Sequence, residues 1–264
     1  HLARRLVGAS HAWVVPAALV ILTVLFSVQW RGTAAMGRFF GPVMLAWFLI
    51  LGVLGGWRIA QYPQVLLAFD PRWAWALIGD APLETYLLLG AVVLALTGAE
   101  TLYADMGHFG RRSIQRAWFL VVLPCLILCY FGQGALILAD PSAVRDPFFL
   151  MAPGWAVPVL VAVATCATII ASQAVISGAY SVTRQAVQLG FWPRMEIRHT
   201  SEESEGQIYM PRVNMLLYLA VVALVLIFRT SDGLAHAYGF AVTGTMLVTS
   251  LLAPSYGWLL FFRG

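Results

Sequence analysis

The chain has 264 residues, of which 61% are apolar and only 11% are charged, and its formal net charge is +4. Soluble domains carry about 25% charged residues, so this composition excludes an ordinary soluble enzyme, a disordered chain and a disulfide-rich secreted domain. The basic residues are all Arg and are scattered along the chain, so no dense basic patch is available to bind a nucleic acid. The composition predicts an all-α polytopic membrane protein.

Apolar runs of about 20 residues predict transmembrane helices. We place seven spans in a single transmembrane domain, 1–264, at roughly 13–30, 39–58, 85–105, 117–139, 155–186, 213–229 and 234–253. The segment 61–78 is interrupted by proline and charge and is expected to form an interfacial hairpin or short helix. The three cysteines, Cys125, Cys129 and Cys166, lie in apolar stretches and are expected to be small buried hydrophobic residues.

The distribution of Arg residues predicts the orientation of the spans. With seven crossings, ten Arg residues fall on one side and six on the other, and the Arg-rich side is expected to be cytoplasmic. The first span then begins outside, and the long loop 187–212 faces the cytoplasm. The chain opens without Met and stops in an aromatic run, so we expect it to be a fragment of a longer protein.

The third predicted span carries polar residues that are costly in a membrane. Its apolar part ends at Leu96, so a complete crossing brings Glu100 into the bilayer, where a carboxylate costs about 2.5–3.5 kcal/mol. Gly98 eases a break in the helix, and a broken helix exposes backbone carbonyls of the kind that form ion sites in secondary transporters. Thr97 offers a hydroxyl on the same helix face as Glu100. Asp105 fits a transport role and an ion pair with neighbouring Arg residues equally well.

Polar residues in the later spans leave two interpretations open. Gln173 and Ser177 lie four residues apart on one helix face; each alone fits helix packing, and together they fit a cavity wall. Tyr238 in the last span fits either a side chain that closes over a site or an interfacial aromatic residue. Gly132 and Gly134 in the fourth span favour packing over a site.

Several long segments, taken together, closely resemble the Kup/HAK/KT family of potassium uptake transporters, and they occur in the family's order. These segments are LTGAETLYADMGHFG at 96–110, YFGQGALIL at 130–138, DPFFLMAP at 146–153, IIASQAVISGAYSVTRQAVQLG at 169–190, HTSEESEGQIYMP at 199–211 and AYGFAVTGTM at 237–246. The resemblance implies part of a LeuT/APC-type inverted-repeat fold, running from its fourth to its tenth helix. It also implies that the family's first and third helices and its C-terminal domain lie outside this chain.

The resemblance further implies potassium uptake across the bacterial inner membrane by potassium–proton symport. Carried over residue by residue, it places Thr97 and Glu100 on the family's broken sixth helix and Tyr238 on its tenth, near the ion site, and we expect these three residues to bind potassium. From the residues themselves, we expect Glu100 and Asp105 to take part in proton coupling, and Gly98, Gln173 and Ser177 to line the cavity. The expected partners are the potassium ion, the lipid bilayer and a second copy in a homodimer, with no cofactor, no other metal and no nucleic acid. A proton-coupled transporter of amino acids or other small organic substrates is the alternative. A channel ranks lower, because no sequence resembling TVGYG is present, and an enzyme has least support.

Overall fold

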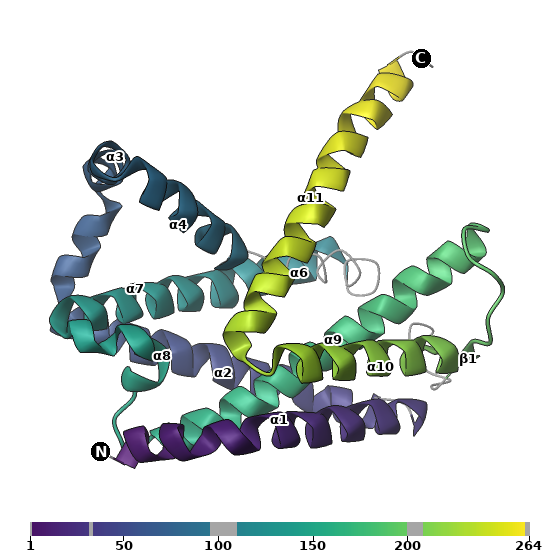
Figure 1. The fold of residues 1–264 in the computed structure, drawn as a ribbon, viewed down its shortest axis with the longest axis horizontal. Helices are drawn as coiled ribbons and strands as arrows, with labels where there is room; N and C mark the ends of the chain where they lie inside the picture. The colour runs from purple at the N-terminus through teal and green to yellow at the C-terminus, as the bar shows by residue number, and fades with distance from the viewer. Residues whose placement is uncertain (1, 32–33, 96–109, 200–207, 262–264) are drawn as a thin grey trace.

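The described part of the chain is almost entirely helical (Figure 1). This computed structural model describes residues 2–31, 34–95, 110–199 and 208–261. The α-helices are α1 Leu2–Val28, α2 Ala34–Gln61, α3 Pro71–Asp80, α4 Pro82–Ala95, α6 Arg111–Ala117, α7 Leu123–Ala139, α8 Pro147–Leu150, α9 Val157–Gln188, α10 Pro211–Phe228 and α11 Ser231–Phe261. The 3-10 helices are Gln29–Arg31, Pro63–Phe69 and Pro141–Arg145, and a π-helical turn covers Trp118–Val122. The strands β1 Arg198–His199 and β2 Ile208–Tyr209 pair antiparallel.

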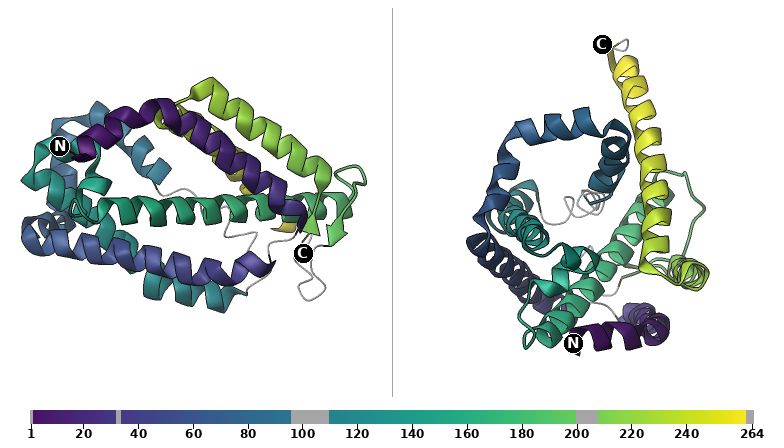
Figure 2. Two further views of the ribbon diagram at one scale, coloured as in Figure 1. Left: turned by 90° about the horizontal axis from the view of Figure 1, so that it is seen from below. Right: turned by 60° about the vertical axis from the view of Figure 1, so that its left-hand side comes forward.

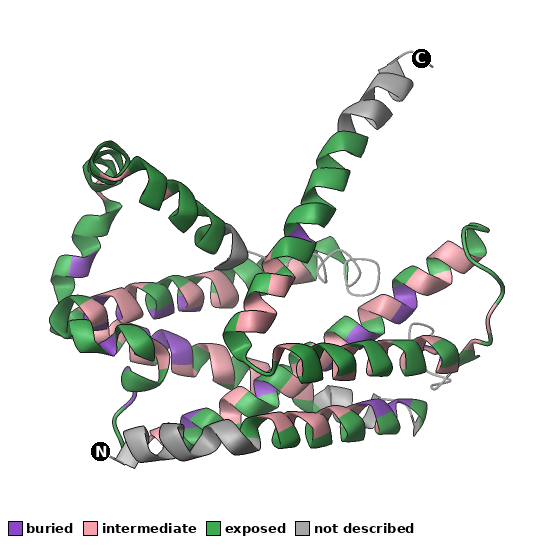
Figure 3. Ribbon diagram, in the orientation of Figure 1, coloured by how far each residue is buried: buried purple, intermediate pink, exposed green. Residues whose placement is uncertain are grey.

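Among the described residues, five helices are long and apolar enough to cross a membrane. They are Phe39–Gln61, Arg111–Ala139, Val157–Gln188, Pro211–Phe228 and Ser231–Leu252. Two further apolar helices, Val14–Val28 and Pro82–Val92, are shorter. Large apolar side chains are exposed on most of these helices. In Figure 3 exposed residues run along much of their length. Helices satisfy their backbone hydrogen bonds internally, so such surfaces suit a hydrocarbon environment. The chain is an all-α membrane protein, as its composition predicts.

The π turn between α6 and α7 has a local cause. It ends at Val122, directly before Leu123 and Pro124 at the start of α7. Proline has no N–H and its ring crowds the preceding helical turn. A wider π turn at this point relieves the crowding without ending the helix. The run from Arg111 to Ala139 therefore continues as one membrane-spanning length.

α2 and α7 form the closest helix pair, because glycines remove the side chains where they cross. A Cβ added to Gly55 would overlap the carbonyl of Leu128, and a Cβ added to Gly132 would overlap the backbone of Gly55. Gly52 makes room for the Cys125 side chain in the same way. Small residues at such crossings let membrane helices approach closely enough for extensive van der Waals contact. The packing role predicted for Gly132 is confirmed.

The connection that follows α7 packs back onto this pair. Asp140 accepts a hydrogen bond from the backbone N–H of Ser142 and so begins the 3-10 turn. Arg58, in the last turn of α2, donates through Nη2 to the carbonyl of Leu150 at 2.8 Å and through Nε to that of Met151 at 3.1 Å. The guanidinium thus satisfies carbonyls at the end of the short helix α8 and ties the connection to α2.

The cysteine prediction is right for two residues and wrong for the third. Cys125 and Cys129 are buried in α7 against α2, whereas Cys166 on α9 is exposed. Ala167, the next residue, is the one buried at this level of α9. On a helix, neighbouring residues point about 100° apart, so only one of the two can face the packed side.

α1, α9 and α10 form a second group, and the loop after α9 packs onto it. Phe26, Ile176, Tyr180, Ile208 and Met210 make one buried cluster. Two of these, Ile208 and Met210, come from the β2 end of the loop rather than from the membrane helices. The hairpin of β1 and β2 is therefore anchored by apolar side chains next to the N-terminal end of α10. Figure 2 shows α1, α9 and α10 lying together in both views.

Residues with positive φ angles follow the ends of α9 and α10. α9 ends in a Schellman arrangement: Phe191 N–H donates to the Ala186 carbonyl and Gly190 N–H donates to that of Val187. Gly190 has φ +77°, which glycine adopts without a Cβ clash. Between α10 and α11, Arg229 takes a left-handed conformation with φ 54°. α11 then extends away from the other helices (Figures 1 and 2).

Candidate functional site

Four of the residues predicted for the ion site, Thr97, Gly98, Glu100 and Asp105, lie outside the described residues. The described helices that flank them are α4, which ends at Ala95, and α6, which begins at Arg111. Their roles therefore stay predictions from sequence.

Tyr238 lies in the second turn of α11, and its side chain is 45% exposed. The hydroxyls that follow it along α11 are turned back onto their own helix. Thr243 donates to the Gly239 carbonyl at 2.8 Å, and Thr245 donates to that of Ala241 at 3.0 Å. Such bonds satisfy a hydroxyl in an apolar surrounding without a partner helix. Among the described residues, no hydrogen bond joins Tyr238 to the polar residues of α9.

Gln173 is 4% exposed and its amide is paired with a second buried amide, that of Gln29. Gln173 Nε2 donates to Gln29 Oε1 at 3.0 Å, and Gln29 Nε2 donates back to Gln173 Oε1. Gln173 Nε2 also reaches the hydroxyl of Ser177 at 3.3 Å. The pair joins α9 to the end of α1. Ser177, one turn further along α9, is exposed.

A second, partly buried polar contact lies two turns beyond Gln173 along α9, between the buried Tyr180 and the half-buried Asn214. The Tyr180 hydroxyl donates to Asn214 Oδ1 at 2.7 Å, and Asn214 Nδ2 donates to the backbone carbonyl of Phe26 at 3.2 Å. Asn214 is on α10, so one amide side chain bonds to both α9 and α1. Together Gln29, Gln173, Tyr180 and Asn214 form what we call the polar junction.

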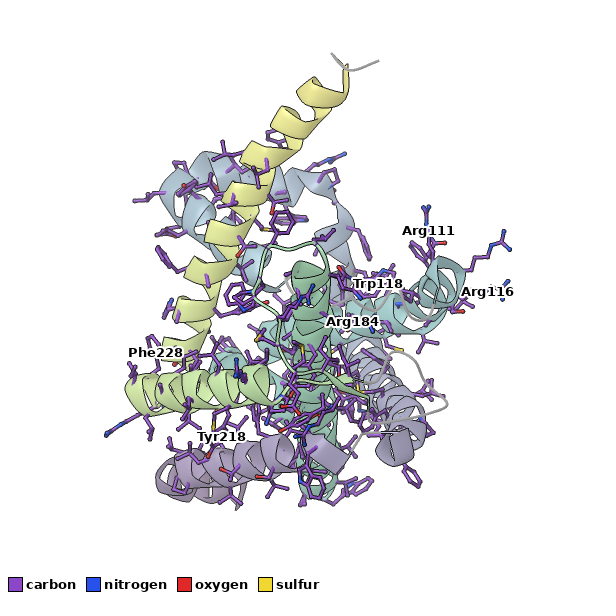
Figure 4. The ribbon with its side chains drawn as sticks, turned by 90° about the vertical axis from the view of Figure 1, so that its right-hand side faces the viewer. Arg111, Arg116, Trp118, Arg184, Tyr218 and Phe228 are labelled. Carbon is purple, nitrogen blue, oxygen red and sulfur yellow. The ribbon has the colours of Figure 1, made fainter. Side chains whose placement is uncertain are left out.

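The interface between α1 and α10 continues with a weaker polar contact. The oxygens of Thr23 and Tyr218 lie 3.0 Å apart, and the Tyr218 ring packs on Phe26 with its centroid 5.5 Å away. Figure 4 shows Tyr218 between the ribbons of these two helices. This hydrogen bond is exposed, whereas the Gln29–Gln173 pair is buried.

Arg184 lies one turn beyond Tyr180 on α9. Its Nε is buried and, within the described part of the chain, has no hydrogen-bond partner. Arg111 and Arg116, by contrast, point outward from α6 into open space (Figure 4). The described residues contain no group of three or more His, Cys, Asp or Glu side chains that could hold a metal ion.

Sequence reasoning found Gln173 and Ser177 but missed Gln29, Tyr180 and Asn214. Gln29 and Asn214 fall within one residue of a predicted span end, where a polar side chain is usual at the membrane interface. One feature of the sequence does point to buried polar contacts. An amide inside an apolar span needs a partner, and Gln29, Gln173 and Asn214 each lie within a predicted span. Only the arrangement of the helices shows which side chains meet.

Comparison with known proteins identifies the family. The family described as "K+ potassium transporter integral membrane domain" matches residues 4–260. The chain belongs to this family. The identification made from the sequence segments is confirmed, and the family is one of transporters rather than enzymes.

Curated relatives of this potassium transporter family carry the name "Probable potassium transport system protein Kup". The protein of Bordetella avium (strain 197N) is 66% identical over 241 residues, which is 91% of this chain and 38% of the relative. That of Pseudomonas putida (strain KT2440) is 59% identical over 254 residues, or 96% of this chain and 40% of the relative. This chain thus spans about two fifths of their length. No solved structure gives a significant match.

Proposed function

We propose that this chain is part of the membrane domain of a potassium uptake transporter. The observation that carries the proposal is the match of the potassium transporter family from residue 4 to residue 260. The relatives that cover the chain at 58–66% identity are named as potassium transport proteins. The five apolar helices within the described ranges that are long enough to span a bilayer fit this role. We propose the inner membrane of a bacterium as its location, in contact with lipid; the apolar composition and the bacterial relatives support this.

The transport mechanism that we propose is potassium–proton symport by alternating access, on part of a LeuT/APC-type fold with about seven spans in this chain. Glu100 is the carboxylate that the sequence brings into the membrane, and it serves both the ion and the proton. Thr97 and Tyr238 supply neutral oxygens for potassium, which suits a large and weakly hydrated cation. Asp105 takes part in proton coupling.

Three further residues are proposed to line the cavity: Gly98, Gln173 and Ser177. The described structure gives a different setting to the last two, since Gln173 is buried against Gln29 and Ser177 is exposed. We therefore expect the Ser177 side chain to face the ion path. The buried Gln173 side chain is expected to lie behind the cavity wall and to hold it in position. The chain acts without a cofactor, and a homodimer is proposed for the full-length protein.

A charge-removal experiment tests this proposal. Glu100→Gln in the full-length protein keeps the side-chain shape and removes the charge. Expressed in a strain that lacks potassium uptake, this variant is expected to lose at least about tenfold in uptake rate, together with the pH dependence of uptake. Glu84→Gln is the matched control, because Glu84 is exposed in the first turn of α4. Wild-type uptake by Glu100→Gln with unchanged pH dependence would contradict the site assignment.

A further inference from the structure

The C-terminal end of α1 has carbonyls that need partners. α1 ends at Val28 and continues into the 3-10 turn Gln29–Arg31, so the regular hydrogen-bond ladder of the α-helix stops there. Two carbonyls near this end accept from side-chain amides: Leu25 from Gln29 at 3.0 Å, and Phe26 from Asn214 at 3.2 Å. Gln29 directly follows α1 in the sequence, whereas Asn214 belongs to α10 and bonds to α1 from there.

Asn214 is itself held from a third helix. Its Oδ1 accepts from the hydroxyl of Tyr180 on α9, and Tyr180 is only 2% exposed. A primary amide offers a donor and an acceptor on one planar group, and here one end serves α1 while the other serves α9. Aspartate would lose the donor, and leucine would lose both.

The surroundings make this geometry costly to break. Phe26, Ile176, Ile208 and Met210 are buried around the same point. In an apolar surrounding, an amide or carbonyl that loses its partner finds no water to replace it. The Phe26 carbonyl, the Asn214 amide and the Tyr180 hydroxyl therefore depend on one another.

We propose that Asn214 is a positioning residue of the transporter. It closes the end of α1 and holds that end against α9, so that the rate of transport depends on it while the affinity for potassium does not. Asn214 acts through Phe26 and Tyr180 and not through the ion. The inference rests on the proposed function, since the rate concerned is that of potassium uptake.

The first test measures potassium uptake by the full-length protein, normalised to the amount of transporter in the membrane. Asn214→Leu is expected to lower the maximal rate about tenfold, with the half-saturating potassium concentration changed less than about twofold. Asn214→Gln, which keeps donor and acceptor, is expected to retain roughly half of the rate. The control, Tyr218→Phe, removes a hydroxyl from the same α1–α10 interface without exposing a helix end, and should stay within about twofold of wild type.

Either of two results would overturn the inference: a wild-type maximal rate in Asn214→Leu, or a raised half-saturating concentration at an unchanged maximal rate. If Asn214→Leu does not accumulate in the membrane, Tyr180→Phe decides instead. It keeps the ring and removes only the hydroxyl, and its maximal rate is expected to fall roughly threefold. A wild-type rate for Tyr180→Phe would then contradict the proposal.

A second test is independent of transport. In the purified full-length protein, the stabilities of Tyr180→Phe, Asn214→Leu and the double variant form a double-mutant cycle. The double variant is expected to be clearly more stable than the sum of the single losses predicts. Strict additivity would overturn the positioning role. If the wild-type protein takes up no potassium, the proposed function fails, while this cycle still reports whether Asn214 joins the helices.

Discussion

In the α2–α7 pair the two backbones meet at Gly55 and Gly132, and the buried side chains between these helices are Cys and apolar residues. In the α1–α9–α10 group the polar junction brings two buried amides together and places the half-buried Asn214 amide against a tyrosine hydroxyl and a backbone carbonyl. Both groups lie in one apolar chain of the same composition. They are nevertheless held together by different physical contacts.

The difference shows what each arrangement can tolerate. Lipid is as apolar as the side chains, so helices in a membrane associate through close packing and hydrogen bonds rather than through burial of apolar surface. Packing at a glycine crossing depends on shape alone, because an atom added to the glycine overlaps the backbone of the other helix. A polar contact depends on its partner, because an amide that loses its partner remains in an apolar surrounding. We therefore expect steric changes to dominate in the first group and loss of partners in the second.

The largest effect is expected from Gly55→Ala. The new Cβ would overlap the Leu128 carbonyl, so α2 and α7 must separate. We expect a loss of about 3 kcal/mol in the free energy of unfolding, measured by SDS titration of the purified full-length protein. Gly56→Ala is the matched control, since a Cβ there meets nothing within 4 Å. Equal stability of the two variants would show that the crossing is not as close as described.

A smaller effect is expected from Gln29→Leu, which leaves the Gln173 amide without its buried partner. The expected loss is about 1–2 kcal/mol in the same titration. The double variant with Gln173→Leu removes both amides and should recover most of that loss. Two leucines of similar size pack against each other and leave no buried polar group without a partner. A double variant that is less stable than Gln29→Leu alone would contradict the pairing.

The smallest effect is expected from Tyr218→Phe. Its hydrogen bond with Thr23 is exposed, and the ring contact with Phe26 survives the change. Interhelical hydrogen bonds of this kind contribute about 0.6 kcal/mol on average, so the titration midpoint should hardly move. A loss as large as that of Gln29→Leu would remove the distinction between buried and exposed polar contacts.

Much of the fold follows from the apolar runs. Their length and composition predict membrane helices, and the glycines of the fourth predicted span indicate close packing, which Gly132 shows. The interrupted segment 61–78 contains short helices, as its prolines indicate. The docking of the loop hairpin through Ile208 and Met210 does not follow, because nothing local tells an apolar loop residue which helix it will meet.

The candidate site is predictable to a different extent. A carboxylate in an apolar span, such as Glu100, is predicted to be functional from its insertion cost alone. Gln29 and Asn214 give a weaker signal, since an amide near a span end costs less to insert than a carboxylate at its centre. Their importance arises only when the end of α1 meets α9 and α10, which is a property of the arrangement of the helices.

The most direct test of the proposed potassium transport is potassium uptake by the purified full-length protein in liposomes, followed together with the internal pH. We expect potassium to enter and the interior to acidify when an inward proton gradient is applied, with no uptake in Glu100→Gln liposomes. Absence of potassium uptake by the wild-type protein under an inward proton gradient would contradict the proposed function.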